Sequence, residues 1–249
     1  MKRLAASTVC LIIVMLFVSC GKSYDYGADE GIVKKISEAC ETVAKSTGYK
    51  GSFVLNMLFS EEDATLMFAQ GYYDTDFTGE MPYVTASMTQ TVLATHSGVQ
   101  VNYENGICTT TTDGTPASTE MTSDEFFGRI IYVRPFVPDT KYIEGIDEIS
   151  SASVKGFKVY LNDAEDVLYP LIGDGIYSLA MIRSPQYDLM NIKDAEISYI
   201  INENSGEITD MTFSFTLYIY DTPTYVPNGK DENLDDYTLD IRITYTVAF

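Results

Sequence analysis

Two stretches in the last third of the chain alternate between apolar and polar residues with a period of two. Apolar residues occupy the odd-numbered positions from Met211 to Ile219 and again from Leu239 to Val247, with mostly Thr, Ser, Tyr, Asp and Arg between them. This period is typical of antiparallel strands that bury one face and expose the other. Because strands adjacent in sequence usually pair, we expect residues 208–220 to lie beside residues 237–247.

Shorter alternating runs predict further strands earlier in the chain. They cover residues 53–59, 65–73, 83–93, 98–103, 107–112 and 197–201, with two more strands inside 141–162. The run Ser60-Glu61-Glu62-Asp63 is expected to turn the first hairpin, and Asn105-Gly106 is a pair that favours a tight turn with positive φ angles. Residues 113–119 are rich in Gly, Pro, Ser and Thr, so we predict a surface loop there.

Two other segments have the pattern of an amphipathic helix. Apolar residues at 32, 33, 36, 40, 43 and 44, with charged residues between them, predict a helix that ends near Gly48. The run Thr122-Ser123-Asp124-Glu125 matches a capping box and precedes an apolar stripe that includes Phe126 and Ile130.

A third, shorter helix is expected from Asp163, as its cap, through Leu168. Many antiparallel strands with few helices place the chain in the α+β class. Residues 20–249, which number 230, are enough for one large domain or two small ones, and we favour a single domain over 31–249.

The N-terminal segment has the layout of an export signal. Two basic residues precede an apolar run from Val9 to Val18, which is shorter than the ~20 residues that a bilayer-spanning helix needs. The run Phe17-Val18-Ser19-Cys20 resembles the lipobox of bacterial lipoproteins, with Phe in place of the usual Leu. This resemblance implies cleavage of the signal peptide at 1–19, lipidation of Cys20 and a short tether over 20–30. The alternative is an ordinary secretory signal.

The charge of the chain is strongly negative. It carries 16 Lys and Arg against 36 Asp and Glu, a formal net charge of −20, and loss of the two basic residues in the signal would lower this to −22. Such a charge repels nucleic acid and anionic lipid headgroups. We therefore expect no nucleic-acid partner, and we expect attachment to the outer face of the membrane to depend on the lipid on Cys20.

Two cysteines, Cys40 and Cys108, lie outside the N-terminal segment. Export permits a disulfide between them, but both fall at positions where a free thiol can pack as a small apolar group. The sequence leaves the two interpretations open.

The order of the elements resembles the LolA/LprG-like lipoproteins. A lipidated cysteine, an opening helix, a meander of strands, an inserted helical stretch and a closing meander carry the resemblance, with phrases such as Gly71-Tyr72-Tyr73-Asp74 and Asn105-Gly106. It implies a single strongly curved antiparallel sheet, a half-barrel, with helices packed in or over its concave face. It also implies binding of an acyl chain or another apolar ligand there. The residues expected to line that site, or an ordinary packed core, are Phe53, Leu55, Met57, Phe126, Ile130, Phe213 and Phe215.

No motif in the sequence predicts catalysis, a metal site or a cofactor. His96 is the only histidine, and patterns for a nucleophile elbow, a zinc site or a phosphate loop are missing from the 249 residues. Residues 231–242 resemble the start of a calcium-binding loop, but Asp236 stands where Gly is needed and Arg242 where Glu is needed. We predict a solvated loop there.

Two hypotheses for the function follow. The first is a non-enzymatic, membrane-anchored lipoprotein that binds or carries a hydrophobic ligand. The second is a structural or protein-interaction surface lipoprotein without a small-molecule ligand.

Overall fold

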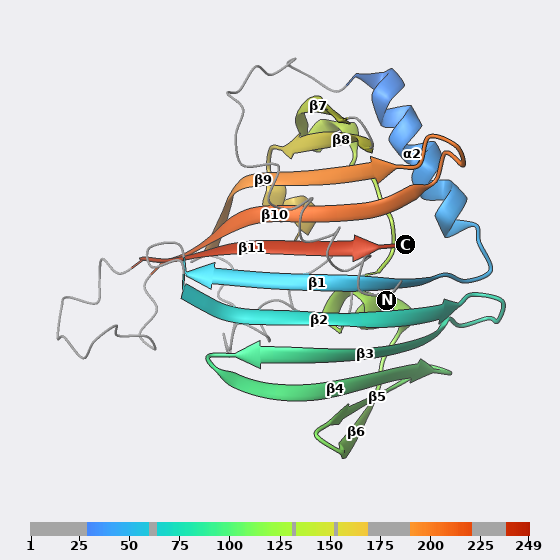
Figure 1. Cartoon of the computed structure of the whole chain (residues 1–249), viewed down its shortest axis with the longest axis vertical. Coiled ribbons are helices and arrows are strands. Elements are labelled where there is room, and N and C mark those ends of the chain that lie inside the picture. Colours follow the sequence, from blue (N-terminus) through green and yellow to red (C-terminus); the bar gives the residue numbers. More distant parts are fainter. Residues whose placement is uncertain (1–28, 60–63, 131–132, 152–153, 169–189, 221–237) are drawn as a thin grey trace.

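The computed structural model describes residues 29–59, 64–130, 133–151, 154–168, 190–220 and 238–249. All strands in these ranges form one antiparallel sheet in the order β6-β5-β4-β3-β2-β1-β11-β10-β9-β8-β7 (Figure 1). The sheet is open, with β6 and β7 as its edges. A large antiparallel sheet with few helices was predicted, and this part of the fold prediction is confirmed. The segment containing Cys20 and the acidic stretches at 60–63 and 228–236 lie outside the described residues.

The elements follow one another with short connections. The helices are α2 (Glu30–Ala44), α3 (Ser123–Arg129) and the 3₁₀ turn η1 (Thr140–Tyr142), and residues 164–168 are also helical. The strands are β1 (Lys50–Phe59), β2 (Ala64–Asp76), β3 (Tyr83–Val92), β4 (Thr95–Glu104), β5 (Ile107–Thr112), β6 (Thr115–Glu120), β7 (Ile143–Ser151), β8 (Val154–Leu161), β9 (Met190–Ile201), β10 (Ile208–Tyr220) and β11 (Thr238–Ala248). No helix in the described ranges is both long and apolar enough to cross a membrane.

Two meanders, β1–β6 and β7–β11, are joined where the first strand pairs with the last. In this junction Leu55 of β1 lies opposite Tyr245 of β11, and Met57 lies opposite Ile243. On its other side β11 pairs with β10, and Phe213 is the partner of Tyr245. The predicted pairing of β10 with β11 is confirmed, and the apolar side chains of three strands meet on one face.

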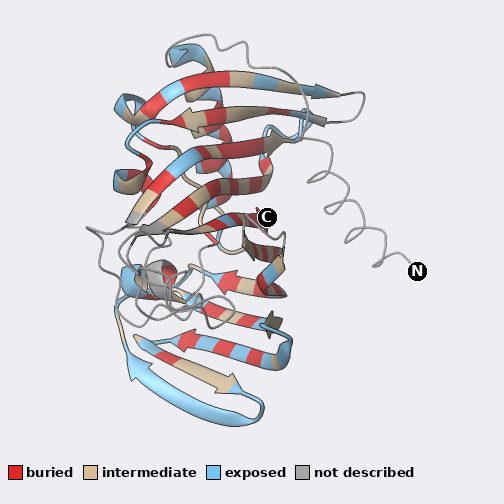
Figure 2. Ribbon diagram, turned by 90° about the vertical axis from the view of Figure 1, so that its left-hand side faces the viewer, coloured by how far each residue is buried: buried red, intermediate tan, exposed pale blue. Residues whose placement is uncertain are grey.

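That face carries the core and the helices. Figure 2 shows the sheet curving, with the helices on one side of it. The predicted first helix is confirmed as α2, which is capped by the Asp29 carboxylate and buries Ile36, Ala39, Cys40 and Val43. The opposite face of the sheet carries mostly Ser, Thr, Asn, Gln and charged residues, because neighbouring side chains on a strand point to opposite faces.

One tight turn between strands was predicted from its residues and another was not. Asn105 and Gly106 both have positive φ, so the predicted tight turn is confirmed. Leu93 and Ala94 form a similar turn, with φ of 45° and 70°, although neither residue favours that conformation. Because neither turn residue is Gly, Asn or Asp, the turn between β3 and β4 was not predicted.

The prediction of a surface loop at 113–119 is wrong. Asp113 and Gly114 form a two-residue turn with positive φ, and β6 follows it along the edge of the sheet with every residue exposed. The residues that flank such a turn bond to each other, so Thr115 faces β5 and the nitrogen of Pro116 faces the free edge. A proline is tolerated there because its missing N–H is not needed for pairing, and it hinders pairing with another chain.

Strand β9 begins at Met190, seven residues before the predicted start. Its pairing with β10 shifts by one residue between Ser214 and Thr216, and Asp194 has a φ of 52°. This bulge places Ile192 and Ala195 on the buried face, three residues apart, which breaks the period of two. The alternation that predicts a strand is interrupted at this bulge, so the first part of β9 was not predicted.

Candidate ligand-binding face

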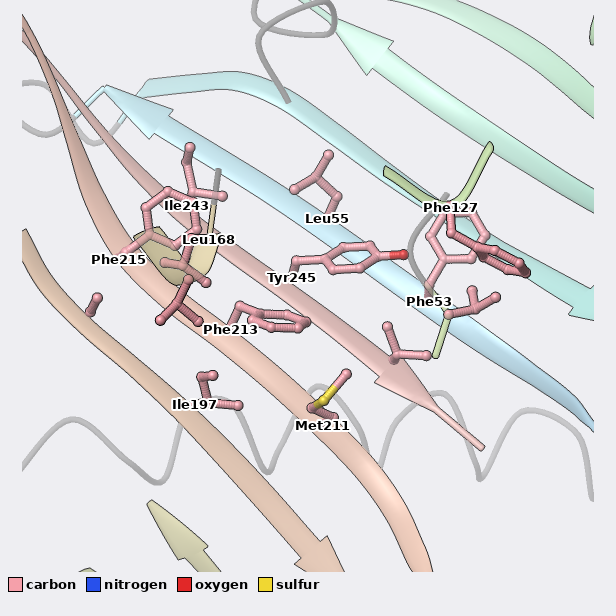
Figure 3. Close-up of a cluster of buried hydrophobic side chains, with 14 of the residues drawn as sticks. Phe53, Leu55, Phe127, Leu168, Ile197, Met211, Phe213, Phe215, Ile243 and Tyr245 are labelled. Atoms are coloured by element: carbon pink, nitrogen blue, oxygen red, sulfur yellow. The ribbon is translucent and has the colours of Figure 1, made fainter. Parts of the chain in front are cut away.

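The apolar face of the sheet holds a cluster of aromatic rings over its central strands. The ring of Tyr245 lies between Phe213, at 6.1 Å between centroids, and Phe53, at 6.2 Å. Figure 3 shows these rings with aliphatic side chains of neighbouring strands around them. The cluster arises because successive strands place their alternating apolar residues in register.

The residues predicted to line a ligand site or a core are nearly all buried. Relative exposure is at most 4% for Phe53, Leu55, Met57, Phe126, Phe213 and Phe215, and Ile130 is half-buried. The five strand residues lie on the same face of β1 and β10, on either side of β11. Phe126 has a different environment, because it stacks on Tyr103 of β4 at 4.5 Å.

An irregular segment, residues 133–138, crosses this apolar face, and we name it the strap. The hydroxyl of Tyr49 donates to the carbonyl oxygen of Val133 at 2.9 Å, and that of Tyr199 donates to the carbonyl oxygen of Phe136 at 3.0 Å. The ring of Phe136 stacks on Phe213 at 5.7 Å with an interplanar angle of 13°. Two hydroxyl bonds and one stacked ring thus hold the strap against the cluster.

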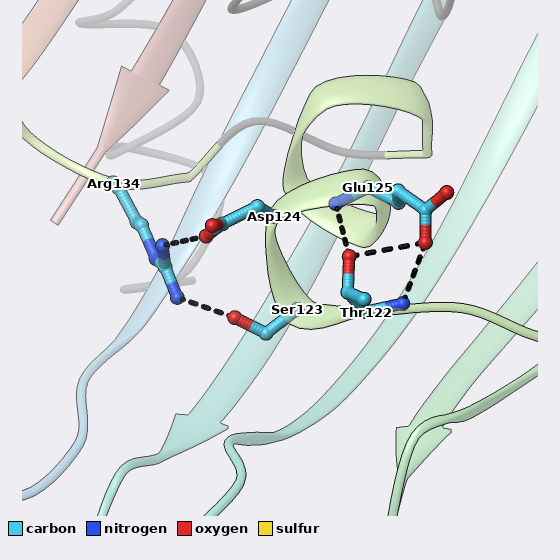
Figure 4. Close-up of polar contacts among 5 residues, drawn as sticks. All are labelled: Thr122, Ser123, Asp124, Glu125 and Arg134. Carbon is cyan, nitrogen blue, oxygen red and sulfur yellow. Dashed lines mark hydrogen bonds and ion pairs between the residues drawn. The ribbon is translucent and has the colours of Figure 1, made fainter.

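The strap is also tied to α3. The guanidinium of Arg134 lies 3.8 Å from the centre of the Phe127 ring. It also reaches Asp124 at 3.4 Å and Ser123 at 3.2 Å (Figure 4). The first turn of α3 is fixed by the predicted capping box between Thr122 and Glu125, which the structure confirms. The strap and α3 therefore form one connected cover.

Buried groups around the strap are held in their neutral form. Burial raises the pKa of the Tyr49 hydroxyl, so it remains a donor at neutral pH. Burial, with a smaller effect of Glu41, raises the pKa of the Cys40 thiol to about 12. The Cys40 sulfur lies 3.7 Å from the carbonyl oxygen of Phe136. Cys40 and Cys108 are both free, so the possible disulfide does not form.

Sequence reasoning missed the residues that hold the strap. Tyr49 and Tyr199 were not distinguished from the chain's other tyrosines, of which there are 19 in all. The two prolines at 135 and 138 indicated where the helix ends, but gave no sign that the residues between them cross the sheet. A run rich in Pro and apolar residues is the signal that could have pointed to a buried, non-helical segment.

The structure describes only part of the residues that were considered for catalysis or metal binding. His96 is exposed in β4, and its Nδ1 lies 2.8 Å from the Thr91 hydroxyl. Within the described residues, no three His, Cys, Asp or Glu side chains gather in a way that could hold a metal ion. Residues 231–237 of the acidic stretch lie outside the described residues.

No protein-family model and no curated protein matches the chain. Among solved structures, the chain is similar to LprF from Mycobacterium bovis, with 11% identity, a TM-score of 0.39, and coverage of 88% of this chain and 93% of that chain. It is also similar to a LolA superfamily protein from Nitrosomonas europaea, with 7% identity, a TM-score of 0.27, and coverage of 88% and 91%. At these scores neither likeness establishes a shared family or activity.

Proposed function

We propose that the protein is a non-enzymatic lipoprotein that binds an apolar ligand, such as an acyl chain, between the sheet and the strap. One observation carries this proposal. The aromatic cluster is covered in part by an irregular segment held through two tyrosine hydroxyls and a stacked ring, rather than by a second sheet. The strap can therefore move away without breaking any hydrogen bond between strands.

The two tyrosine hydrogen bonds and the stacked ring add little to the energy of such a movement. A buried hydrogen bond contributes about 1 kcal/mol net, and an aromatic pair adds about 1 kcal/mol beyond its buried area. An acyl chain that replaced the Phe136 ring on Phe213 would restore the apolar contact that the strap gives up. The ligand and the strap would thus compete for one surface.

The proposed ligand fits the proposed location. A protein that is lipidated at Cys20 and held at the outer face of the membrane meets acyl chains in its immediate surroundings. Replacement of Cys20 by Ala should abolish incorporation of labelled palmitate and release the protein from membranes. Unchanged membrane association of this variant would contradict the anchoring proposal.

Mass spectrometry of the complete chain tests ligand binding. Acyl groups attached covalently contribute to the mass under both native and denaturing conditions, whereas a bound ligand contributes only under native conditions. We expect a native mass that exceeds the denatured mass by that of one lipid, and organic extraction should recover the lipid. Equal masses, together with no uptake of added fatty acid, would refute the proposal.

A second candidate is a surface lipoprotein that contacts other proteins and holds no small molecule. It is favoured by the packing of the predicted ligand residues, six of which are at most 4% exposed and lie among other buried side chains. A partner protein recovered in stoichiometric amounts, with no lipid in the native mass, would support this candidate.

A further inference from the structure

The opposite face of the sheet carries a hollow that the proposed function does not use. It has a volume of about 410 Å³ and lies over strands β2 to β5. Strand pairing arranges its polar side chains in two rows that run across the strands. One row is Tyr72, Ser87, Gln100 and Thr111, and the other is Asp74, Thr85, Asn102 and Thr109. Four strands at a spacing of about 4.8 Å give each row a length of roughly 15 Å.

Polar side chains in this hollow lack the partners found elsewhere on the same face. Across β8 to β11, Thr212 bonds to Thr246 at 3.0 Å and Lys158 bonds to Glu196 at 2.8 Å. In the hollow, six of the eight side chains in the two rows have no hydrogen-bond partner among the described residues; they are Tyr72, Thr85, Ser87, Gln100, Asn102 and Thr111. Their donors and acceptors are therefore available to a ligand.

The charge of the hollow selects against ionic ligands. Its lining has no Lys, Arg or His, and its one carboxylate, Asp74, forms an ion pair with Lys50 at the border. A phosphorylated or sulfated ligand would meet no cation in the lining and would be repelled by a chain with a net charge of −20. A cationic ligand would compete with Lys50 for the only acid.

The hollow also offers apolar contact beside its polar groups. The Tyr72 side chain is 67% exposed at one end of its row, and a ring held at a surface can stack on the C–H face of a sugar. The threonines present methyl groups together with hydroxyls, which suits a ligand whose surface alternates between C–H and O–H groups. We propose that this hollow binds a neutral saccharide chain, which lies across β2 to β5 against Tyr72.

Binding of neutral hexasaccharides to the complete chain tests this proposal. The probes are cellohexaose, chitohexaose and maltohexaose, with hexagalacturonate as an anionic comparison, measured by saturation-transfer NMR and calorimetry. We expect at least one neutral probe to bind with a Kd between about 10 µM and 1 mM. This range is typical of a ligand that gains a few hydrogen bonds and one stacked ring. Hexagalacturonate should bind at least about tenfold more weakly because of the net charge.

Substitutions of residues in the hollow test whether the saccharide binds there. Tyr72→Ala and Gln100→Ala should each weaken binding about tenfold, because both side chains are exposed and contribute to the hollow. Tyr218→Ala is the matched control, since Tyr218 lies on the same face of β10, beyond β1 and β11, with Lys193 above its ring. It should leave the Kd unchanged.

The binding measurements either support or overturn the saccharide site. Binding that depends on Tyr72 and Gln100 but not on Tyr218 supports the saccharide site. A failure of all three neutral probes to bind, or binding that Tyr72→Ala and Gln100→Ala leave unchanged, would overturn it. Thermal unfolding of each variant shows whether the fold is intact, and none of these results depends on whether lipid binds to the other face.

Discussion

Removal of the two hydroxyls that hold the strap should make the apolar face easier to open. In the double variant Tyr49→Phe, Tyr199→Phe the rings and their packing remain, but the carbonyls of Val133 and Phe136 lose their tyrosine donors. Each lost bond contributes about 1 kcal/mol, so the free energy of opening should fall by about 2 kcal/mol. At 1.4 kcal/mol per factor of ten, the open form should become about 30-fold more populated.

The single variant Tyr73→Phe provides a matched control. Its hydroxyl donates to the carbonyl oxygen of Ala248 at 2.8 Å, so the variant loses the same kind of bond to a carbonyl outside the strap. Nile red is a suitable probe, since it is neutral and is not repelled by a charge of −20. We expect the double variant to take up the dye about 30-fold faster than the unchanged protein and Tyr73→Phe to take it up at the original rate. Equal rates in all three proteins would refute the role of the strap as a removable cover.

Two further predictions concern stability. Gly71→Ala would place a Cβ atom 2.5 Å from the carbonyl oxygen of Ser87 and 2.9 Å from the Phe53 ring, which should lower the free energy of unfolding by about 1–3 kcal/mol. Gly98→Ala, whose Cβ would meet no atom within 4 Å, should leave stability the same or slightly higher in thermal unfolding, and an equal loss in both variants would contradict the packing argument. For Cys40 the folded pKa of about 12 exceeds the ordinary value of 9.0, so its contribution is complete below pH 9 and is lost as the pH rises toward 12, by up to about 1.4 kcal/mol per pH unit. Urea unfolding between pH 8 and pH 11 should therefore show a steeper loss of stability in the unchanged protein than in Cys40→Ala, and parallel curves would contradict this assignment.

Local signals in the sequence predicted much of the fold. The alternation over residues 211–219 and 239–247 is uninterrupted, and both strands form as expected. The capping box of α3 and the Asn105-Gly106 turn each depend on only a few adjacent residues, and both are present. Such features depend on short-range chemistry, which a single sequence contains in full.

The remaining features depend on contacts between distant parts of the chain. Pairing of β1 with β11 joins residues about 190 positions apart, and no local pattern specifies it. For the candidate site, the buried rings were predicted from their positions in strands, but the strap was not. Its position is set by Tyr49 and Tyr199, which lie 84 and 63 residues away from the carbonyls they bind.

The two proposed sites can be tested separately because of the alternation within each strand. In β2, Tyr73 points to the buried face, whereas Tyr72 and Asp74 point to the hollow. A substitution at Tyr72 therefore leaves the aromatic cluster intact, and a change in the strap leaves the two polar rows intact. Because the sheet between them keeps its hydrogen bonds whether the strap is open or closed, the coupling free energy between an apolar ligand and a saccharide should be close to zero. A measured coupling of 1 kcal/mol or more would mean that opening the strap changes the curvature of the sheet, because a ligand can influence a distant site only by binding one conformation better than another.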